Sequence, residues 1–358
     1  MKPKPAFCLA IACTFIFFIN KGLGQTTPAI TSLFGRDDVL SISLKGSIRG
    51  LLNDREGIPK SFPLILAYYN NDSTEVAMPV NVKTRGHFRR MKENCSYPPL
   101  MIEFPKDGVQ HANIFKDQKK LKLVMPCRGN EFVIREWLAY RIYNLLSPFS
   151  FKVRLVKVKL DDNVNRKMSA EFYGLLLEEE KQMAARNNAA IIEKTIQPYQ
   201  TDVKEFINMS VFQYMIGNTD WSIQYQQNIK LLLLKSNNMP IAVPYDFDHS
   251  GIVNAPYAQP AEELLMSSIR QRRYRGYCIT DLSVFEDVLK KFNDLKTNMY
   301  KIYTNCKLID TKYLKSTTQY LDDFFETISN TKAWQKDFAY PCDKNGTGNV
   351  IIKGLKED

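Results

Sequence analysis

The stretch MIGNTDWSIQYQQNIKLLLLKSNNMPIAVPYDFDHSG, residues 215–251, places polar turns on both sides of a buried apolar segment. We interpret it as a helix end, a turn presenting Asp220, a polar span to Asn228, a buried strand, and a turn carrying Asp246 and Asp248. Carboxylate and amide oxygens bind hard divalent cations, and a further carboxylate can orient a hydroxyl nucleophile. The stretch therefore predicts a phosphoryl-transfer site, although Asp and Asn are also common turn formers.

The residues before this stretch predict a sheet. LSISLKGSIRGLL and MPVNVKTRG alternate in polarity, and FPLILAYY and PPLMIEF are rich in apolar β-formers. KLKLV, which contains Lys122, is a further short strand, and a hairpin of residues 151–160 and 172–181 completes an antiparallel sheet of five to seven strands. One main helix, FVIREWLAYRIYNLL, interrupts the strands and has a broad apolar face.

The pattern changes from strands to helices near residue 180. Helices are predicted at KEFINMSVFQYMIGNT and at residues 261–273, 282–303 and 313–328, while the tail from Trp334 contains few apolar residues and is expected to be loosely held. We therefore predict an α+β protein of two lobes, with a β-rich N-lobe over residues 25–180 and a mostly helical C-lobe over residues 181–358.

The N-terminus has the pattern of a signal peptide. Lys2 and Lys4 precede an apolar run over residues 6–19, and small residues follow at 22–24. The run is too short to span a membrane comfortably. We expect residues 1–24 to be removed from an exported protein that is periplasmic, surface-bound or secreted, and we expect no transmembrane segment in the mature chain.

Export affects the interpretation of the cysteines. Five remain in the mature chain, an odd number that leaves at least one free or intermolecular thiol. Cys95 and Cys127 lie at the ends of neighbouring strand-like segments, and we predict a disulfide between them, in line with an oxidising compartment. The chain has no CxxC motif and only three histidines, which disfavours a zinc site.

Several functional classes lack their motifs. The sequence has no GxSxG, GxGxxG or GxxxxGK[ST] motif. The formal net charge is +11, but basic residues cluster only at 116–122 and 270–275, without a nucleic-acid-binding motif, so nucleic acid is not an expected partner. The cluster IRQRRYRG is either a solvated helix end or an anion-binding surface.

Three further residues are candidates for phosphate binding. Lys122 on a strand, followed by Glu136 on the next helix, is the pairing that nucleotide sites use to hold a phosphate-binding lysine. Alternatively, Glu136 pairs with a nearby arginine on the polar face of the helix. Arg85 belongs to TRGHFRR, which is either an exposed basic loop or a cap over phosphates, because guanidinium groups bind phosphate bidentately.

The order of these elements is that of a protein kinase, and the chain resembles the CotH family of secreted atypical kinases. The resemblance lies in TRGHFRR, CSYPPLMIEF, KLKLV, REWLAYRIYNLL, YGLLLEEEK, GNTDW with a downstream QN, and PYDFDHSG. It implies a bilobal protein-kinase-like fold, ATP, Mg²⁺ or Mn²⁺, and transfer of phosphate to a Ser or Thr hydroxyl of a protein acceptor.

The resemblance also implies individual roles. Asp220 would be the catalytic aspartate, and Lys122 and Glu136 would form an ion pair at the nucleotide. The strand end at Glu178 would border the adenine pocket. The metal would be held by Asn228 and Asp246, with Asp248 as a second ligand.

The interval from Asp220 to Asn228 is longer than the four intervening residues of the protein-kinase loop, so residues 222–227 must bulge or form a turn. An alternative function is therefore a catalytically inactive, kinase-like binding module. Such a module would grip an acidic partner or a glycan through TRGHFRR and IRQRRYRG. A metal-dependent hydrolase at the same acidic residues is a third hypothesis. The sequence does not indicate an oligomeric state.

Overall fold

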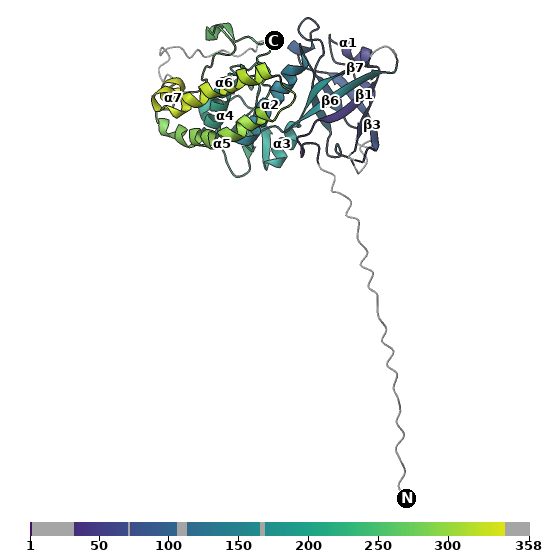
Figure 1. Ribbon diagram of the computed structural model, residues 1–358, viewed down its shortest axis with the longest axis horizontal. Coiled ribbons are helices and arrows are strands. Elements are labelled where there is room, and N and C mark those ends of the chain that lie inside the picture. The colour runs from purple at the N-terminus through teal and green to yellow at the C-terminus, as the bar shows by residue number, and fades with distance from the viewer. Residues whose placement is uncertain (2–31, 71, 106–112, 165–168, 341–358) are drawn as a thin grey trace.

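The computed structural model describes Met1 and residues 32–70, 72–105, 113–164 and 169–340. Most of the predicted signal peptide therefore lies outside the described residues. The mixed α+β organisation is confirmed, with a strand-rich N-terminal part and a helix-rich C-terminal part at opposite ends of the molecule (Figure 1).

The strands are β1 (Leu40–Gly46), β2 (Phe62–Tyr69), β3 (Glu75–Thr84), β4 (Leu100–Glu103), β5 (Lys120–Val124), β6 (Val153–Asp162), β7 (Ser169–Leu177), β8 (Ala189–Ile192), β9 (Ile229–Leu234) and β10 (Ile241–Pro244). The helices are α1 (Ile48–Asn53), α2 (Asn130–Leu146), α3 (Glu180–Arg186), α4 (Val203–Ile216), α5 (Glu286–Thr304), α6 (Thr311–Ser329) and α7 (Thr331–Phe338).

The N-terminal strands form a closed barrel rather than the open antiparallel sheet expected from the sequence. Its order is β1-β2-β3-β4-β5-β7-β6, and a parallel pairing of β1 with β6 closes it, whereas the other neighbours are antiparallel. Closure removes both exposed edges of the sheet. The inward side chains, such as Leu44, Leu66, Val82 and Leu123, fill the barrel and form one of the two hydrophobic cores.

Helix α2 connects the barrel to the helical part. It packs against β6 and β7 on one side and against α4 and α5 on the other. The sequence predicted one buried face, but Trp137, Leu138, Tyr140 and Tyr143 are buried around the helix. A helix apolar on nearly all sides is buried on nearly all sides, so α2 belongs to the core of the C-terminal part.

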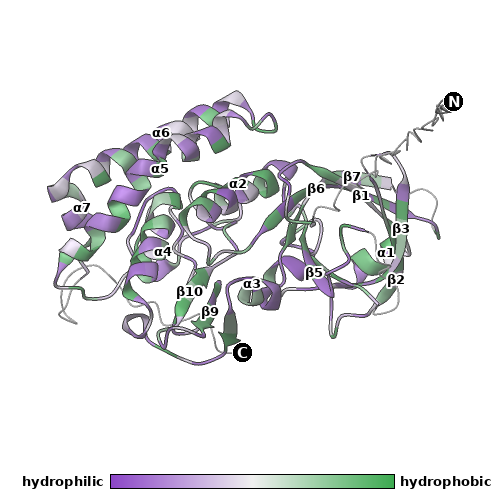
Figure 2. Cartoon of the chain, turned by 90° about the horizontal axis from the view of Figure 1, so that it is seen from below, coloured by the Kyte–Doolittle hydropathy of each residue, from purple (hydrophilic) through white to green (hydrophobic). Residues whose placement is uncertain are grey.

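The C-terminal part contains a small sheet, β10-β9-β8, whose outer strands contact α3 and α4. Helices α5 and α6 each carry hydrophobic and hydrophilic residues in Figure 2, and their buried residues face the second core. Among the described residues, no helix is both long enough and apolar enough to cross a membrane.

Four local predictions differ from the structure. The second half of LSISLKGSIRGLL, expected to continue a strand, forms the helix α1. Residues 261–273 are mostly irregular, with one short 3-10 turn over 262–264, and β8 lies in a segment expected to be helical. The start of the tail is helical rather than loosely held, because α7 buries Trp334 and Phe338, one helical turn apart, against Phe285, while residues 341–358 lie outside the described residues. In each segment, tertiary packing outweighs a weak local pattern.

Candidate functional site

Asp220 lies in a tight turn directly after α4. The helix ends at Gly217, whose φ of 66° is in the left-handed region that glycine tolerates. The side-chain oxygen of the buried Asn218 then accepts a hydrogen bond from the backbone N–H of Asp220 at 3.0 Å. The turn fixes the direction in which the Asp220 side chain leaves the backbone.

The long interval from Asp220 to Asn228 folds into a small hairpin. Ser222 pairs with Gln227 in an isolated β-bridge, and this brings Asn228 back to Asp220. The Asn228 amide nitrogen donates to the Asp220 backbone oxygen at 2.7 Å and to its carboxylate at 3.0 Å, while the Gln227 amide donates to the other carboxylate oxygen. The interval is therefore accommodated by a turn, and two amides orient the carboxylate.

Burial raises the pKa of Asp220. Asp248 raises this pKa further, whereas His249, Arg275 and the hydrogen bond from Asn228 lower it. Desolvation is the largest of these effects because it disfavours the charged form of a carboxylate. Asp220 is thus a partly desolvated carboxylate with a fixed orientation, which suits a group that receives a proton.

Asp246 follows β10 and faces the same cleft. Its φ of 64° is unusual for a residue other than glycine, and its backbone N–H donates to the Tyr140 hydroxyl at 2.8 Å. Burial and then the neighbouring Asp248 raise the pKa of Asp246 to about 6, against the opposing effects of Arg89 and Arg85. Within the described part of the chain, no donor hydrogen-bonds to the Asp246 carboxylate.

Asp248 has a different environment from Asp246. Its carboxylate accepts a hydrogen bond from the Tyr257 hydroxyl at 3.0 Å and forms an ion pair with Arg89 at 3.4 Å. Arg89 also donates to the backbone oxygen of Met125, in the barrel part. Asp248 thus connects the two parts of the molecule through Arg89, in addition to the metal-binding role predicted for it.

Lys122 and Arg85 approach Asp246 from the barrel side. The Lys122 ammonium lies 5.2 Å from the centre of the Tyr245 ring. Burial, followed by repulsion from Arg85, lowers the pKa of Lys122 to about 8, and burial also lowers the pKa of Arg85. These groups are thus partly desolvated, and attraction to Asp246 acts on each of them.

The predicted ion pair between Lys122 and Glu136 is not formed. Among the described residues, no ion pair within 4.0 Å joins them, and Lys122 interacts electrostatically with Glu180 instead. Glu136 lies deep in the cleft, where burial and the charges of Asp248 and Asp246 raise its pKa well above the ordinary value. One of its carboxylate oxygens is buried without a hydrogen-bond partner. Because α2 is buried on both faces, Glu136 is drawn inward and lies near the acidic turn instead of beside Lys122.

Glu178 lies outside the cleft. Its carboxylate forms an ion pair with Arg186 at 3.0 Å and accepts the backbone N–H of Lys152. The preceding residue, Leu177, does line the cleft beside Lys122. Successive residues of a strand point in opposite directions, so Glu178 supports the strand end while Leu177 forms the cavity wall.

The candidate residues line two adjoining cavities of about 190 and 600 Å³. The smaller cavity is basic, with Arg85, Lys122 and Arg89, and the larger one contains Asp220, Asn228, Asp246 and Asp248. Phe88, Arg89 and Asp246 line both cavities, which makes them one cleft.

A divalent cation fits this donor set only together with a further ligand. The Asp246 carboxylate and the Asn228 side-chain oxygen accept no hydrogen bond from the described residues, so both are available. In the described ranges, no group of three or more His, Cys, Asp or Glu side chains is arranged to hold a metal. Mg²⁺ is commonly held by one or two carboxylates plus phosphates and water, and this arrangement matches that requirement.

Several residues of the cleft were given no individual role from the sequence, although Gln227 lies in the quoted QN pair and Arg275 in the basic cluster. Gln227 and Tyr140 act through single hydrogen bonds, and Tyr257 is a separate turn residue that reaches Asp248. Arg275 donates to the backbone oxygens of Thr219 and Trp221, on either side of Asp220. Polar contacts between distant turns have no periodicity, so spacing could not predict them.

The basic cluster of residues 270–275 is largely structural. Arg270 donates to the backbone oxygens of Gly251 and Ser316, and Arg272 donates to those of Met215 and Tyr320. Both guanidinium groups also lie over the Tyr320 ring. The cluster is therefore neither a solvated helix end nor, at these two arginines, a free anion-binding surface.

The cysteine prediction is confirmed. Cys95 and Cys127 form a disulfide, Cys278 is also disulfide-bonded, and Cys306 is a free cysteine. The first bond joins the segment after Arg89 and Arg90 to the residues that follow β5. It therefore fixes the basic side of the cleft covalently.

Comparison with known proteins gives few relatives. No protein-family model matches the chain. The flagellar M-ring protein of Borreliella burgdorferi is 24% identical over an alignment of 212 residues, and the match covers 53% of this chain and 36% of that protein. The match thus spans about a third of the relative's length. This degree of identity does not show a family, and the resemblance to the CotH family stays a prediction.

One similar solved structure is that of the Helicobacter pylori proinflammatory kinase CtkA. The two chains are 12% identical, and their structural alignment covers 66% of this chain and 92% of the kinase, with a TM-score of 0.39. The similarity is distant, and it does not establish a common fold or a function for this chain.

Proposed function

We propose that the protein is an exported, CotH-like kinase with a divergent bilobal kinase-like fold. It would bind a metal complex of ATP in the cleft and transfer the terminal phosphoryl group to a Ser or Thr hydroxyl of a protein. The observation that supports this proposal best is the convergence of Asp220, Asn228 and Asp246 on one cleft that also contains Lys122 and Arg85.

The basic end of the cleft suits the phosphates. Lys122, Arg85 and Arg89 supply positive charge at one end, and the bidentate geometry of guanidinium groups matches phosphate oxygens. Asp246 and the side-chain oxygen of Asn228 would hold Mg²⁺ or Mn²⁺. When bound, the metal neutralises charge that develops on the phosphates.

Asp220 is positioned to receive the acceptor proton. As the acceptor oxygen bonds to the terminal phosphorus, the bond from that phosphorus to the bridging oxygen breaks, ADP leaves, and the hydroxyl proton passes to Asp220. The hydrogen bonds from Gln227 and Asn228 hold the carboxylate in place during this step. The carboxylate then returns its proton to water.

The oxidised wild-type protein provides the test. Incubation with γ-labelled ATP, millimolar Mn²⁺ or Mg²⁺ and a generic acceptor such as casein should label the acceptor or the protein itself. Asp246→Asn should abolish both labelling and metal-dependent ATP binding. Asp294→Asn, which changes an exposed carboxylate on α5, is the matched control and should behave as wild type. Failure of the wild type to bind ATP, or equal labelling by Asp246→Asn, would overturn the proposal.

The alternative of an inactive binding module receives no support from the basic cluster. Arg270, Arg272 and Arg275 bind backbone oxygens inside the molecule, so charge reversal there would damage the fold. A metal-dependent hydrolase is equally unsupported, because the described donor set lacks a multi-carboxylate cage.

A further inference from the structure

Another cavity, separate from the two that form the cleft, lies on the far side of the Asp220 turn. Its volume is about 210 Å³. Trp221 and Ser222, the two residues after Asp220, line both this cavity and the acidic part of the cleft, as does Arg275. The two spaces therefore adjoin at a wall that includes Arg275 and the turn that carries the proposed catalytic carboxylate.

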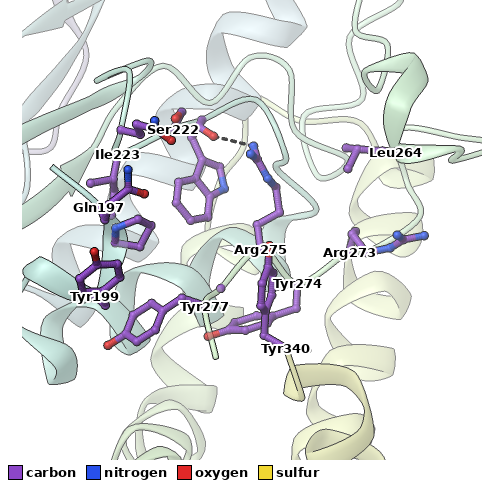
Figure 3. Close-up of a pocket in the computed structure, with 14 residues that line it drawn as sticks. Gln197, Tyr199, Ser222, Ile223, Leu264, Arg273, Tyr274, Arg275, Tyr277 and Tyr340 are labelled. Atoms are coloured by element: carbon purple, nitrogen blue, oxygen red, sulfur yellow. Dashed lines mark hydrogen bonds between the residues drawn. The ribbon is translucent and has the colours of Figure 1, made fainter. Parts of the chain in front are cut away.

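Five of the fourteen residues that line this cavity are aromatic. Gln197, Tyr199, Ser222 and Ile223 lie on one side, Leu264 and Arg273 lie on the opposite side, and Tyr274, Tyr277 and Tyr340 lie between them (Figure 3). Tyr199 stands at the rim with 63% of its surface exposed. Exposed aromatic rings beside a hollow are typical of places where a partner side chain is bound.

The lining also has a distinctive polarity. Among the residues that the structure describes, it contains two arginines, two glutamines and a serine, but no Asp or Glu. Arg275 is engaged with the backbone oxygens of Thr219 and Trp221, and its guanidinium lies 5.3 Å from the centre of the Trp221 ring. The interior thus presents rings and amides without a carboxylate to attract a cationic side chain.

Shape and composition together indicate the occupant. About 210 Å³ is below the range of roughly 300 to 1,000 Å³ typical of sites for drug-sized molecules, and suits one large side chain. Aromatic walls favour an aromatic or large aliphatic group, and the amides at the rim can hydrogen-bond to the backbone beside it. A sugar ring would also stack on these aromatic rings, and it is the competing occupant that the second experiment tests.

The hairpin of residues 221–228 couples this cavity to Asp220. Its first half, from Trp221 to Gln224, lines the cavity, while Gln227 and Asn228 in its second half bind the Asp220 carboxylate. The backbone hydrogen bond from Ser222 to Gln227, at 2.9 Å, ties the two halves together. A side chain seated in the cavity would therefore be held at a fixed position relative to Asp220.

We infer that this cavity is the specificity pocket for the protein acceptor, which binds an aromatic or large aliphatic residue close in sequence to the phosphorylated Ser or Thr. This inference rests on the proposed kinase function and deepens it. The substrate class is a peptide segment in which a hydroxyl residue and a large apolar residue are near neighbours.

The first experiment uses a positional library of serine-centred peptides with labelled ATP. We expect selection for aromatic or large aliphatic residues at one flanking position. Tyr199→Ala should abolish this selection and raise the KM for the best peptide about 5- to 10-fold, with the KM for ATP unchanged. Tyr199→Phe, which keeps the ring, should resemble wild type. A flat library profile, or a profile that Tyr199→Ala leaves unchanged, would overturn the inference while the kinase function stands.

The second experiment needs no turnover. Saturation-transfer NMR with N-acetyl-tryptophanamide should show contact with the wild type and with Tyr199→Phe, and loss of contact with Tyr199→Ala. Methyl α-glucoside serves as the competing probe, and Tyr199-dependent binding of the sugar alone would overturn the inference. If tryptophanamide binds as expected while the wild type transfers no phosphate, the cavity binds a large apolar side chain, but its role in selecting a phosphorylation site is overturned together with the kinase function.

Discussion

The two ends of the cleft are built in different ways. At the acidic end, the Asp220 and Asp248 carboxylates are fixed by hydrogen bonds from Gln227, Asn228 and Tyr257, in turns that belong to the helical part. At the basic end, Lys122 lies on a barrel strand and is positioned by burial and a ring contact rather than by an ion pair within the described residues.

This difference in hydrogen bonding indicates that the basic end has more charge available for a ligand. The acidic end is already assembled, and only the Asp246 carboxylate there has no donor among the described residues. The basic end keeps desolvated charge available, a condition that costs stability and that a bound polyanion would relieve. Arg89 is the contact between the ends, since it binds both Met125 in the barrel part and Asp248.

The largest effect is expected at Asp220. Asp220→Asn should lower kcat about 1,000-fold, because it removes the proton acceptor, and it should leave the KM for ATP nearly unchanged. Gln227→Ala, which removes one donor to the carboxylate, should lower kcat by about 10-fold. Steady-state kinetics with the oxidised protein measure both values. Equal loss of ATP affinity and kcat in Asp220→Asn would place Asp220 among the nucleotide ligands instead.

The next effect concerns the uncompensated Asp246. Between pH 3.8 and about 6 the folded state binds more protons at this carboxylate than the unfolded chain does. Its contribution to the free energy of unfolding therefore decreases as pH rises through that window, by about 3 kcal/mol in total. Without added metal and with EDTA present, Asp246→Asn should be more stable than wild type at pH 7 by up to this amount.

Urea unfolding at several pH values checks this prediction, and the difference between Asp246→Asn and wild type should shrink towards pH 4. A destabilised Asp246→Asn protein at pH 7 would mean that the carboxylate has a stabilising partner in solution.

A smaller effect is expected at Lys122. Lys122→Gln should weaken ATP binding about 10-fold by removing a charge from the phosphate end. Since the pKa of Lys122 is lowered to about 8, wild-type affinity should also decline as pH rises through 8. Lys122→Arg stays charged and should not show this decline. Fluorescence titration with a labelled nucleotide gives the affinities, and identical pH profiles for wild type and Lys122→Arg would count against the assignment.

The smallest effect concerns the link between the ends. Tyr257→Phe removes the hydroxyl that donates to Asp248 and should lower the free energy of unfolding by about 1 kcal/mol. Because Arg89 still pairs with Asp248, ATP affinity should change by less than about 2-fold. A large loss of affinity would show that the orientation of Asp248 controls the nucleotide end directly.

Much of the fold followed from periodicity. The strands of the barrel, helix α2 and the long helices α5 and α6 have strong apolar patterns, and each was predicted close to its observed position. The parallel closure of the barrel was not predicted, because β1 and β6 are more than a hundred residues apart and nothing local specifies their pairing. The helix predicted over residues 261–273 was wrong for a similar reason. Its arginines donate to backbone oxygens that are distant in the sequence, instead of continuing a helix.

The features of the site also separate into those that local sequence patterns predict and those that depend on distant contacts. That Asp220, Asn228, Asp246 and Lys122 lie around one cleft could be anticipated, because they occur at the ends or on the faces of predictable elements; their chemical roles stay predictions. The side-chain directions of Glu136 and Glu178 were not predictable, because burial of α2 on both faces and the alternation of β7 depend on the assembled core. Gln227 and Arg275 lie in motifs that the sequence analysis quoted, but their contacts around Asp220 were not predicted, because these contacts form only in the folded chain.

The disulfide has a practical consequence for anyone preparing the protein. Cys95 and Cys127 hold together the two segments on which Arg89 and its backbone partner Met125 stand. Protein made in a reducing cytosol would lack this disulfide. If Arg89 were then held less firmly, the sample would be mistaken for a naturally inactive protein. The redox history of a sample therefore has to be known before its lack of activity is attributed to the sequence.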